Sequence, residues 1–189
     1  MDIHGFLTTH QLPSSYAETA QKWFTPLCEQ LLKHQEGATK PFIVGINGSQ
    51  GSGKSTLTSF IEYYLSSVHG KQVVSLSIDD FYFDQSQRNA LAIKVHPLLA
   101  TRGVPGTHNI PLALDTLRNL DSGSRTLLPR FDKATDNPFP TEQWPVIASS
   151  PDFIILEGWC VGATPQSQSE LKPPINHLEE VEDPLGIWR

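Results

Sequence analysis

The chain has 189 residues, 38% of them hydrophobic and 18% charged, which is enough for a folded domain with a buried core and excludes a disordered chain. Its net charge of −6 and isoelectric point of about 5.6 argue against a broad nucleic-acid-binding surface, which would be basic. No segment approaches the ~18 apolar residues of a membrane span, and the N-terminus lacks a signal-peptide pattern, so we expect a cytoplasmic protein without nucleic-acid or membrane partners.

Two cysteines, Cys28 and Cys160, lack the spacing of a zinc site or a redox pair. We expect both to be free thiols in a reducing compartment, packed as small apolar residues.

The first predicted element is a helix over residues 14–35, where apolar residues recur at helical spacing. Ser14 or Ser15 is expected to be its N-cap, and Pro26 is a candidate break.

An apolar run, residues 42–46, then predicts a parallel strand that is buried on both faces. An amphipathic helix follows over residues 57–68, and Gly70 is expected to end it. Further strands are predicted at residues 72–78 and 153–158.

The segments between and after these strands are less regular. Residues 84–110 are rich in turn residues, and Pro111 is expected to open a short helix that buries Leu114, Leu117 and Leu120. We expect a loop over residues 128–140 and no strand over residues 161–189.

This order of elements predicts an α/β fold in which helices flank a parallel sheet, and together with a glycine-rich loop at residues 48–55 that matches GxxxxGK[ST], it indicates the three-layer P-loop NTPase type. Three strands make a thin sheet, so we expect the sheet to be incomplete. We treat 1–189 as one domain, with an N-terminal helical segment at 1–38, a nucleotide-binding core at 40–160 and an irregular tail at 161–189.

A glycine-rich loop separates the first predicted strand from the following helix. Its sequence matches the phosphate-binding pattern GxxxxGK[ST] without a misfit. Glycines let a phosphate chain approach the backbone, whose amides and the helix N-terminus then attract the anion. The alternative is a flexible connector, but a strand before and a helix after favour ATP binding. The expected ATP-binding residues are Gly48, Ser49, Gln50, Gly51, Ser52, Gly53, Lys54, Ser55 and Thr56, with Lys54 on the β- and γ-phosphates and Ser55 on Mg²⁺.

Acidic residues follow the other two strands, at the sheet edge where α/β proteins bind ligands. Asp79 and Asp80 follow the second strand, where a carboxylate can accept the proton of an attacking hydroxyl or bind Mg²⁺. We assign catalysis to Asp79 and metal binding to Asp80, although Asp80 can equally cap the next turn. Glu157 ends the third strand in the Walker B position, where it can hold a metal-bound water, and we assign it to catalysis and metal binding.

A cluster of mostly basic residues lies in the loops between the second and third strands. Phosphoryl transfer requires cations, and an acidic acceptor requires a carboxylate clamp, but each residue alone can equally be a solvated surface charge. The cluster comprises Arg102, His108, Arg130, Asp132 and Lys133.

Several motifs together resemble the D-glycerate 3-kinase branch of P-loop kinases. They are GSQGSGKST, SIDDFYF, HPLLATRGVPGTHN, LPRFDKATD and ILEGWCVG, in this order, and the resemblance covers residues 40–189. More broadly, the chain is similar to the uridine kinase, phosphoribulokinase and pantothenate kinase class.

The resemblance implies ATP- and Mg²⁺-dependent transfer of the γ-phosphate to a hydroxyl of a small metabolite. It implies that residues 48–56 bind the triphosphate, that Asp79 is the general base and that Glu157 is the Walker B acid. It places Tyr82, Arg102, His108 and Arg130 in the acceptor-side motifs. We add Lys133 to the expected substrate residues, and Lys54 and Arg130 to the catalytic residues.

Two features depart from the branch. Asn109 stands where its pattern has an aspartate. The branch also continues with two more strands and an arginine-bearing lid, so we expect a truncated chain that binds nucleotide weakly and turns over poorly without the lid.

Three functions therefore remain open. The first is a metabolite kinase with D-glycerate as acceptor, and the second is a nucleotide-binding regulatory protein without catalysis. The third is a kinase of the same class whose acceptor is a nucleoside, pantothenate or a sugar phosphate. The sequence leaves the oligomeric state open.

Overall fold

The computed structural model describes residues 2–39 and 41–189, which form two compact units. Unit 1 comprises the chain up to Ile78 together with Leu114–Leu128 and Pro145–Val161. Unit 2 comprises Asp79–Ala113, Pro129–Trp144 and Gly162–Arg189.

Unit 1 contains a three-stranded parallel sheet with the order β1-β7-β2. The strands are β1 (Phe42–Asn47), β2 (Val73–Ser77) and β7 (Phe153–Gly158), at the positions that the apolar runs predict. The prediction that the first strand is buried on both faces is wrong, because β1 lies at an edge of the described sheet and Ile43 is 55% exposed. The central strand β7 places Glu157 opposite Ile46 on one side and Ser77 on the other. The predicted α/β fold with a parallel sheet flanked by helices is therefore confirmed.

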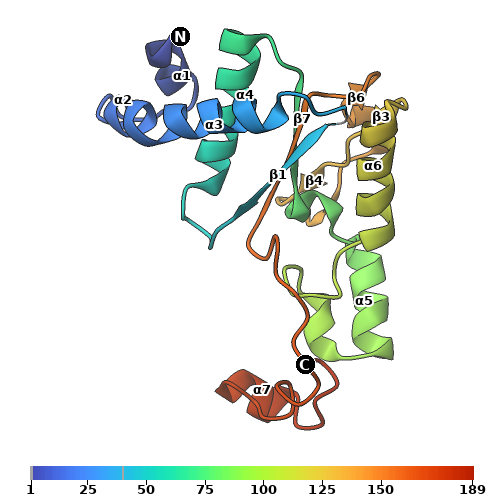
Figure 1. Ribbon diagram of the computed structural model, residues 1–189. Coiled ribbons are helices and arrows are strands. Elements are labelled where there is room, and N and C mark those ends of the chain that lie inside the picture. The colour runs from blue at the N-terminus through green and yellow to red at the C-terminus, as the bar shows by residue number, and fades with distance from the viewer. Residues whose placement is uncertain (1, 40) are drawn as a thin grey trace. The chain divides into compact units, whose positions relative to one another are not determined.

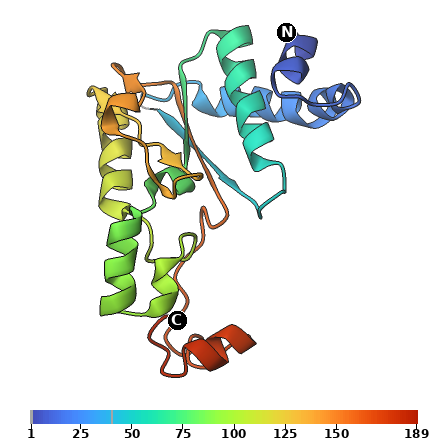
Figure 2. The same cartoon turned by 180° about the vertical axis from the view of Figure 1, so that it is seen from behind.

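Four helices and one π-helical turn of unit 1 gather on one side of these strands (Figures 1 and 2). They are α1 (Ile3–Thr9), α2 (Tyr16–Thr19), the π turn η1 (Ala20–Phe24), α3 (Thr25–Gln35) and α4 (Lys54–His69). Gly70 ends α4 in the left-handed conformation, as predicted, because a residue without Cβ adopts it at little cost.

One apolar core joins these helices to the sheet. It contains Phe6 of α1, Cys28 of α3, Phe60 of α4 and Phe153 of β7. Neither cysteine forms a disulfide. Cys28 packs as an apolar residue in this core, as predicted, and its burial raises the pKa of the thiol to about 12. Among the described residues, no helix combines the length and apolarity that a membrane crossing requires.

Two local predictions for the N-terminal helix have different outcomes. Ser15 occupies the N-cap position of α2, as predicted, but its side chain makes no capping hydrogen bond within the described chain, and its backbone angles are helical. The prediction of a break at Pro26 is wrong. Pro26 lies in the first turn of α3, directly after η1, where a backbone amide has no acceptor within the α-helix, so the missing amide hydrogen of proline costs little.

Helix α6 (Ile110–Ser122) forms where Pro111 predicts it, but its buried face differs. Leu120 is fully buried, whereas Leu114 is 45% exposed, and Thr116 is buried instead. Positions 116 and 120 are one helical turn apart and therefore share a face. The remaining strands of unit 1 are the short antiparallel pair β3 (Thr126–Leu127) and β6 (Val146–Ile147).

Unit 2 contains regular elements where we expected irregular chain. Asp84 and Gln87 form a reciprocal capping box that starts α5 within the supposedly irregular 84–110. Within the predicted loop 128–140, two short strands pair antiparallel. The elements are η2 (Ile78–Phe81), α5 (Gln85–Lys94), η3 (Pro97–Ala100), β4 (Phe131–Asp132), β5 (Asn137–Pro138), η4 (Thr141–Gln143) and, in the tail, α7 (His177–Glu182).

Candidate nucleotide and acceptor sites

The glycine-rich loop connects β1 to α4 directly, since β1 ends at Asn47 and α4 begins at Lys54. Gly51 and Gly53 have φ angles of +77° and +87°, which residues with a side chain rarely adopt. At Gly48, an added Cβ would lie 2.5 Å from the Ser52 hydroxyl oxygen. The loop therefore depends on glycine at these three positions, as the motif predicts.

The N-terminus of α4, which directly follows this loop, has no side-chain cap within the described chain. Its N-cap residue is Gly53, which has no side chain to accept a bond from the first-turn amides. A helix of 16 residues also carries a positive partial charge at this end. The loop and the helix end together can therefore bind a polyanion such as a triphosphate.

Lys54 and Glu157 form an ion pair in unit 1. The Lys54 Nζ lies 3.8 Å from the Glu157 Oε2, and their side chains are 19% and 12% exposed. Within the part of the chain that the structure describes, this Oε2 atom is buried and accepts no hydrogen bond. Because an unsatisfied buried carboxylate oxygen is costly, the arrangement suits a further polar ligand at Glu157.

Asp79 is the centre of the predicted acceptor residues in unit 2. The Tyr82 hydroxyl donates to its Oδ1 at 2.8 Å, and the Lys133 Nζ donates to its Oδ2 at 2.6 Å. These two bonds orient the carboxylate. The structure thus brings together three residues that the sequence analysis predicts separately.

His108 packs against Tyr82, with ring centroids 4.5 Å apart, and the two residues also form a β-bridge. Burial lowers the pKa of His108, and the nearby Asp79 charge opposes this shift. The His108 Nε2 is buried and has no hydrogen-bond partner among residues 2–39 and 41–189. A neutral imidazole at this position can therefore offer a hydrogen bond to a small ligand.

Arg130 and Asp80 pair with each other. Their closest contact is 3.2 Å, from the Arg130 Nη1 to the Asp80 Oδ2. The Phe131 amide donates to the Asp80 Oδ1, also at 3.2 Å. Asp80 therefore holds Arg130 and the adjacent backbone in position through an ion pair and a hydrogen bond. This is a third role for Asp80, beside the metal binding and turn capping that the sequence suggests.

Arg102 is held by two residues that sequence analysis did not identify. Its guanidinium pairs with Asp136, whose other carboxylate oxygen pairs with the fully buried Arg88. Arg102 also lies over the Phe131 ring, 5.7 Å from its centroid. A turn pattern at Asp136 and the capping box before Arg88 are visible in the sequence, but neither indicates that the two residues meet.

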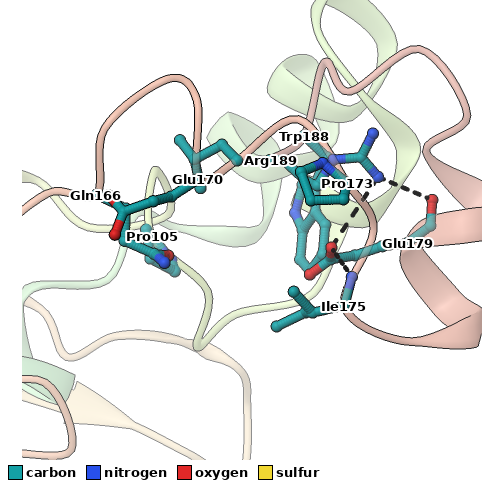
Figure 3. A pocket seen from close by; sticks show the side chains of 9 residues that line it. Pro105, Gln166, Glu170, Pro173, Ile175, Glu179, Trp188 and Arg189 are labelled. Carbon is teal, nitrogen blue, oxygen red and sulfur yellow. Dashed lines mark hydrogen bonds and ion pairs between the residues drawn. The ribbon is translucent and has the colours of Figure 1, made fainter.

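A separate cavity of about 180 Å³ lies in the tail of unit 2 (Figure 3). Ile175, Trp188 and Arg189 line part of it, and the Ile175 amide donates to the Glu179 carboxylate at 3.0 Å. Its described lining contains none of the predicted site residues.

Asp132, the acidic member of the predicted basic cluster, is held within its own turn. Its carboxylate accepts hydrogen bonds from the Thr135 hydroxyl and the Ala134 amide, and these bonds lower its pKa.

The loop between β1 and α4, with a lysine beside the acid of the adjacent strand, is the arrangement typical of P-loop nucleotide-binding proteins. The chain belongs to the Phosphoribulokinase / Uridine kinase family, a family of P-loop kinases, whose sequence profile matches residues 43–164. The resemblance to P-loop kinases of the D-glycerate 3-kinase branch is thereby confirmed.

Several relatives can be compared in detail. The chain is 34% identical over 152 residues to the "Uncharacterized kinase mug58" of Schizosaccharomyces pombe, covering 74% of this chain and 54% of the relative. It is 28% identical over 158 residues to the chloroplastic D-glycerate 3-kinase of Arabidopsis thaliana, covering 78% of this chain and 34% of the relative. The solved structure of D-glycerate 3-kinase from Cryptococcus neoformans is 30% identical with a TM-score of 0.66, covering 81% of this chain and 56% of that one. The chain thus spans between about a third and a little over half of these relatives' lengths.

Proposed function

We propose that the protein is an ATP-dependent kinase that transfers the γ-phosphate to a hydroxyl of a small metabolite, with D-glycerate as the first candidate acceptor. The observation that carries the proposal is the glycine loop between β1 and α4, with Lys54 3.8 Å from Glu157. Two relatives that bear the name D-glycerate 3-kinase support the acceptor.

Unit 1 is proposed to bind ATP and Mg²⁺. The positive φ angles of Gly51 and Gly53 and the unsatisfied oxygen of Glu157 fit a bound polyanion and a hydrated metal ion. In this proposal the amides of residues 48–56 bind the phosphates, Lys54 neutralises the γ-phosphate, and Ser55 and Glu157 hold Mg²⁺. When bound, ATP would supply the phosphoryl group, and Mg²⁺ would neutralise charge on the phosphates.

Unit 2 is proposed to bind and activate the acceptor. The acceptor oxygen forms a bond to the γ-phosphorus, the bond from that phosphorus to ADP breaks, and Asp79 takes the hydroxyl proton. Tyr82 and Lys133 hold the Asp79 carboxylate in place. Arg102 and His108 are proposed to bind the acceptor, since a guanidinium suits a carboxylate and the His108 Nε2 can form a hydrogen bond.

Arg130 and Asp80 are proposed to act on the transferring phosphate. Arg130 would stabilise the equatorial oxygens, as a cation does in phosphoryl transfer. Asp80 holds Arg130 and the backbone beside it, and its proposed contribution to Mg²⁺ would come in addition to these contacts.

Nucleotide binding is tested with Lys54→Ala, using Lys33→Ala on the exposed face of α3 as the matched control. Removing a charge-assisted contact to phosphate should weaken ADP binding about tenfold or more, while Lys33→Ala should leave it unchanged. The measurement is titration calorimetry with Mg²⁺ present. Equal affinity in Lys54→Ala and the unmodified protein would refute the assignment.

Catalysis is tested by ADP release with glycerate, uridine, pantothenate and ribulose 5-phosphate. If the unmodified protein releases ADP with glycerate and Asp79→Asn does not, the full proposal is supported. Release with another acceptor keeps the kinase but changes its substrate. Nucleotide binding without release for any acceptor supports a regulatory protein instead.

A further inference from the structure

A cavity of about 250 Å³ adjoins the glycine loop within unit 1. Its lining includes residues of the loop, Gly48 and Lys54 among them. It also includes the aromatic and apolar residues Tyr16, Phe24, Ile46 and Leu57. The same cavity therefore offers polar and cationic groups together with an apolar, aromatic surface.

The two aromatic rings come from the N-terminal helical segment, outside the phosphate-binding motif. Tyr16 opens α2 and Phe24 ends η1, and their ring centroids lie 5.9 Å apart at an angle of 63°. Phe24 also packs against the fully buried Phe60 of α4, with centroids 5.5 Å apart. This contact holds the aromatic wall in place relative to the helix that follows the loop.

A nucleotide has the same two-part chemistry as this cavity. Its phosphates suit the loop, and its flat heterocyclic base suits aromatic side chains. Any base can stack on an aromatic ring, because stacking uses the face of the base and not its hydrogen-bonding edge. The Asn47 side chain, which also lines the cavity, already donates to the Val161 carbonyl at 2.7 Å. Apart from the Tyr16 hydroxyl, stacking and apolar contact are therefore the interactions that the aromatic and apolar residues of the lining offer.

We propose that Tyr16 and Phe24 form the subsite for the base of the bound nucleotide. The proposal rests on the proposed function, because the loop that lines the cavity is the loop that is proposed to bind ATP. It gives the N-terminal helices a direct part in nucleotide binding, in addition to their part in the core.

The test compares ADP with tripolyphosphate, which has the phosphates but no base, by calorimetry in the presence of Mg²⁺. Losing one stacking partner should weaken ADP binding about tenfold in Tyr16→Ala. Tripolyphosphate affinity should stay within about twofold, since its contacts are confined to the loop. Tyr16→Phe keeps the ring and should bind ADP as the unmodified protein does.

Two further variants guard against effects on folding. Tyr16→Leu keeps an apolar side chain without an aromatic face. It should also weaken the binding of ADP and leave the binding of tripolyphosphate unchanged. Trp23→Leu is the matched control, because Trp23 lies in η1 but is 64% exposed and does not line the cavity. It should change neither affinity.

The outcomes separate this inference from the function on which it rests. If both ligands bind the unmodified protein and Tyr16→Leu alters both equally or neither, the base subsite is wrong and the phosphate site stands. If neither ADP nor tripolyphosphate binds the unmodified protein, the proposed function fails and the subsite fails with it.

Discussion

Arg88 shows how one side chain can organise a site without belonging to any motif. It is fully buried, and its guanidinium donates to the carbonyl oxygens of Phe83 at 2.5 Å and Ala100 at 3.2 Å. It also pairs with Asp136, which in turn pairs with Arg102. A buried arginine is stable only when such partners surround it, so the position of Arg102 depends on a residue that sequence alone would leave on a helix surface.

Replacement of Arg88 tests this network. Arg88→Met keeps a long apolar side chain but leaves three carbonyls, those of Phe83, Ala100 and Asp136, and one carboxylate oxygen of Asp136 without their donor. We therefore expect a loss of about 3 kcal/mol in the free energy of unfolding. Arg118→Met is the control, because the Arg118 ion pair with Asp115 is exposed and contributes little. Urea denaturation measures both, and equal midpoints for the two variants would contradict the role of Arg88.

At the scale of elements, local signals explain both the successful and the wrong predictions. The strand, loop and helix around residues 42–69 were predictable because glycine spacing and helical periodicity are contained in that one segment. Helix α5 was also visible, through Asp84 and Gln87, but turn residues around it outweighed that signal. The buried face of α6 could not be predicted, because what covers a helix is decided by segments elsewhere in the chain.

The capping box of α5 supplies the second prediction. Asp84→Ala removes the bond from the Gln87 amide to the Asp84 carboxylate, which is 2.7 Å long, so we expect a loss of about 1 kcal/mol in stability. Ser15→Ala is the matched control at the start of α2, where the serine side chain makes no cap within the described chain. Thermal unfolding followed by circular dichroism should lower the Tm for Asp84→Ala only. A similar Tm decrease in both variants would contradict the assignment.

At the scale of the whole molecule, the proposed functions divide between two compact units. Unit 1 carries the phosphate loop with Lys54 and Glu157, and unit 2 carries Asp79 with the basic cluster. The N-terminal segment belongs to the core of unit 1, since Phe6 packs edge-on against Phe60 with ring centroids 5.3 Å apart. The first helices are thus part of the fold that supports the loop.

Phe6 provides the test of that integration. Phe6→Ala should cost about 3 kcal/mol, because it leaves a cavity beside α4 in a core that the sheet shares. Trp23→Ala, which removes an exposed ring from the same segment, should cost less than about 0.5 kcal/mol. Denaturation is followed by both tryptophan fluorescence and circular dichroism. Unchanged stability in Phe6→Ala would show that the segment is not part of the cooperative core.

The sequence by itself determined the parallel α/β fold, the glycine-rich loop after the first strand and the acids at the ends of the other two strands, because each of these is a pattern within one short segment. Only the tertiary structure decided which charges meet, such as Lys54 with Glu157, Lys133 with Asp79 and Asp136 with both Arg88 and Arg102. It also decided that Tyr16 and Phe24 line the cavity beside the loop. The physical reason is that an ion pair or a shared cavity joins segments far apart in the chain, and packing and burial, rather than local pattern, select the partners.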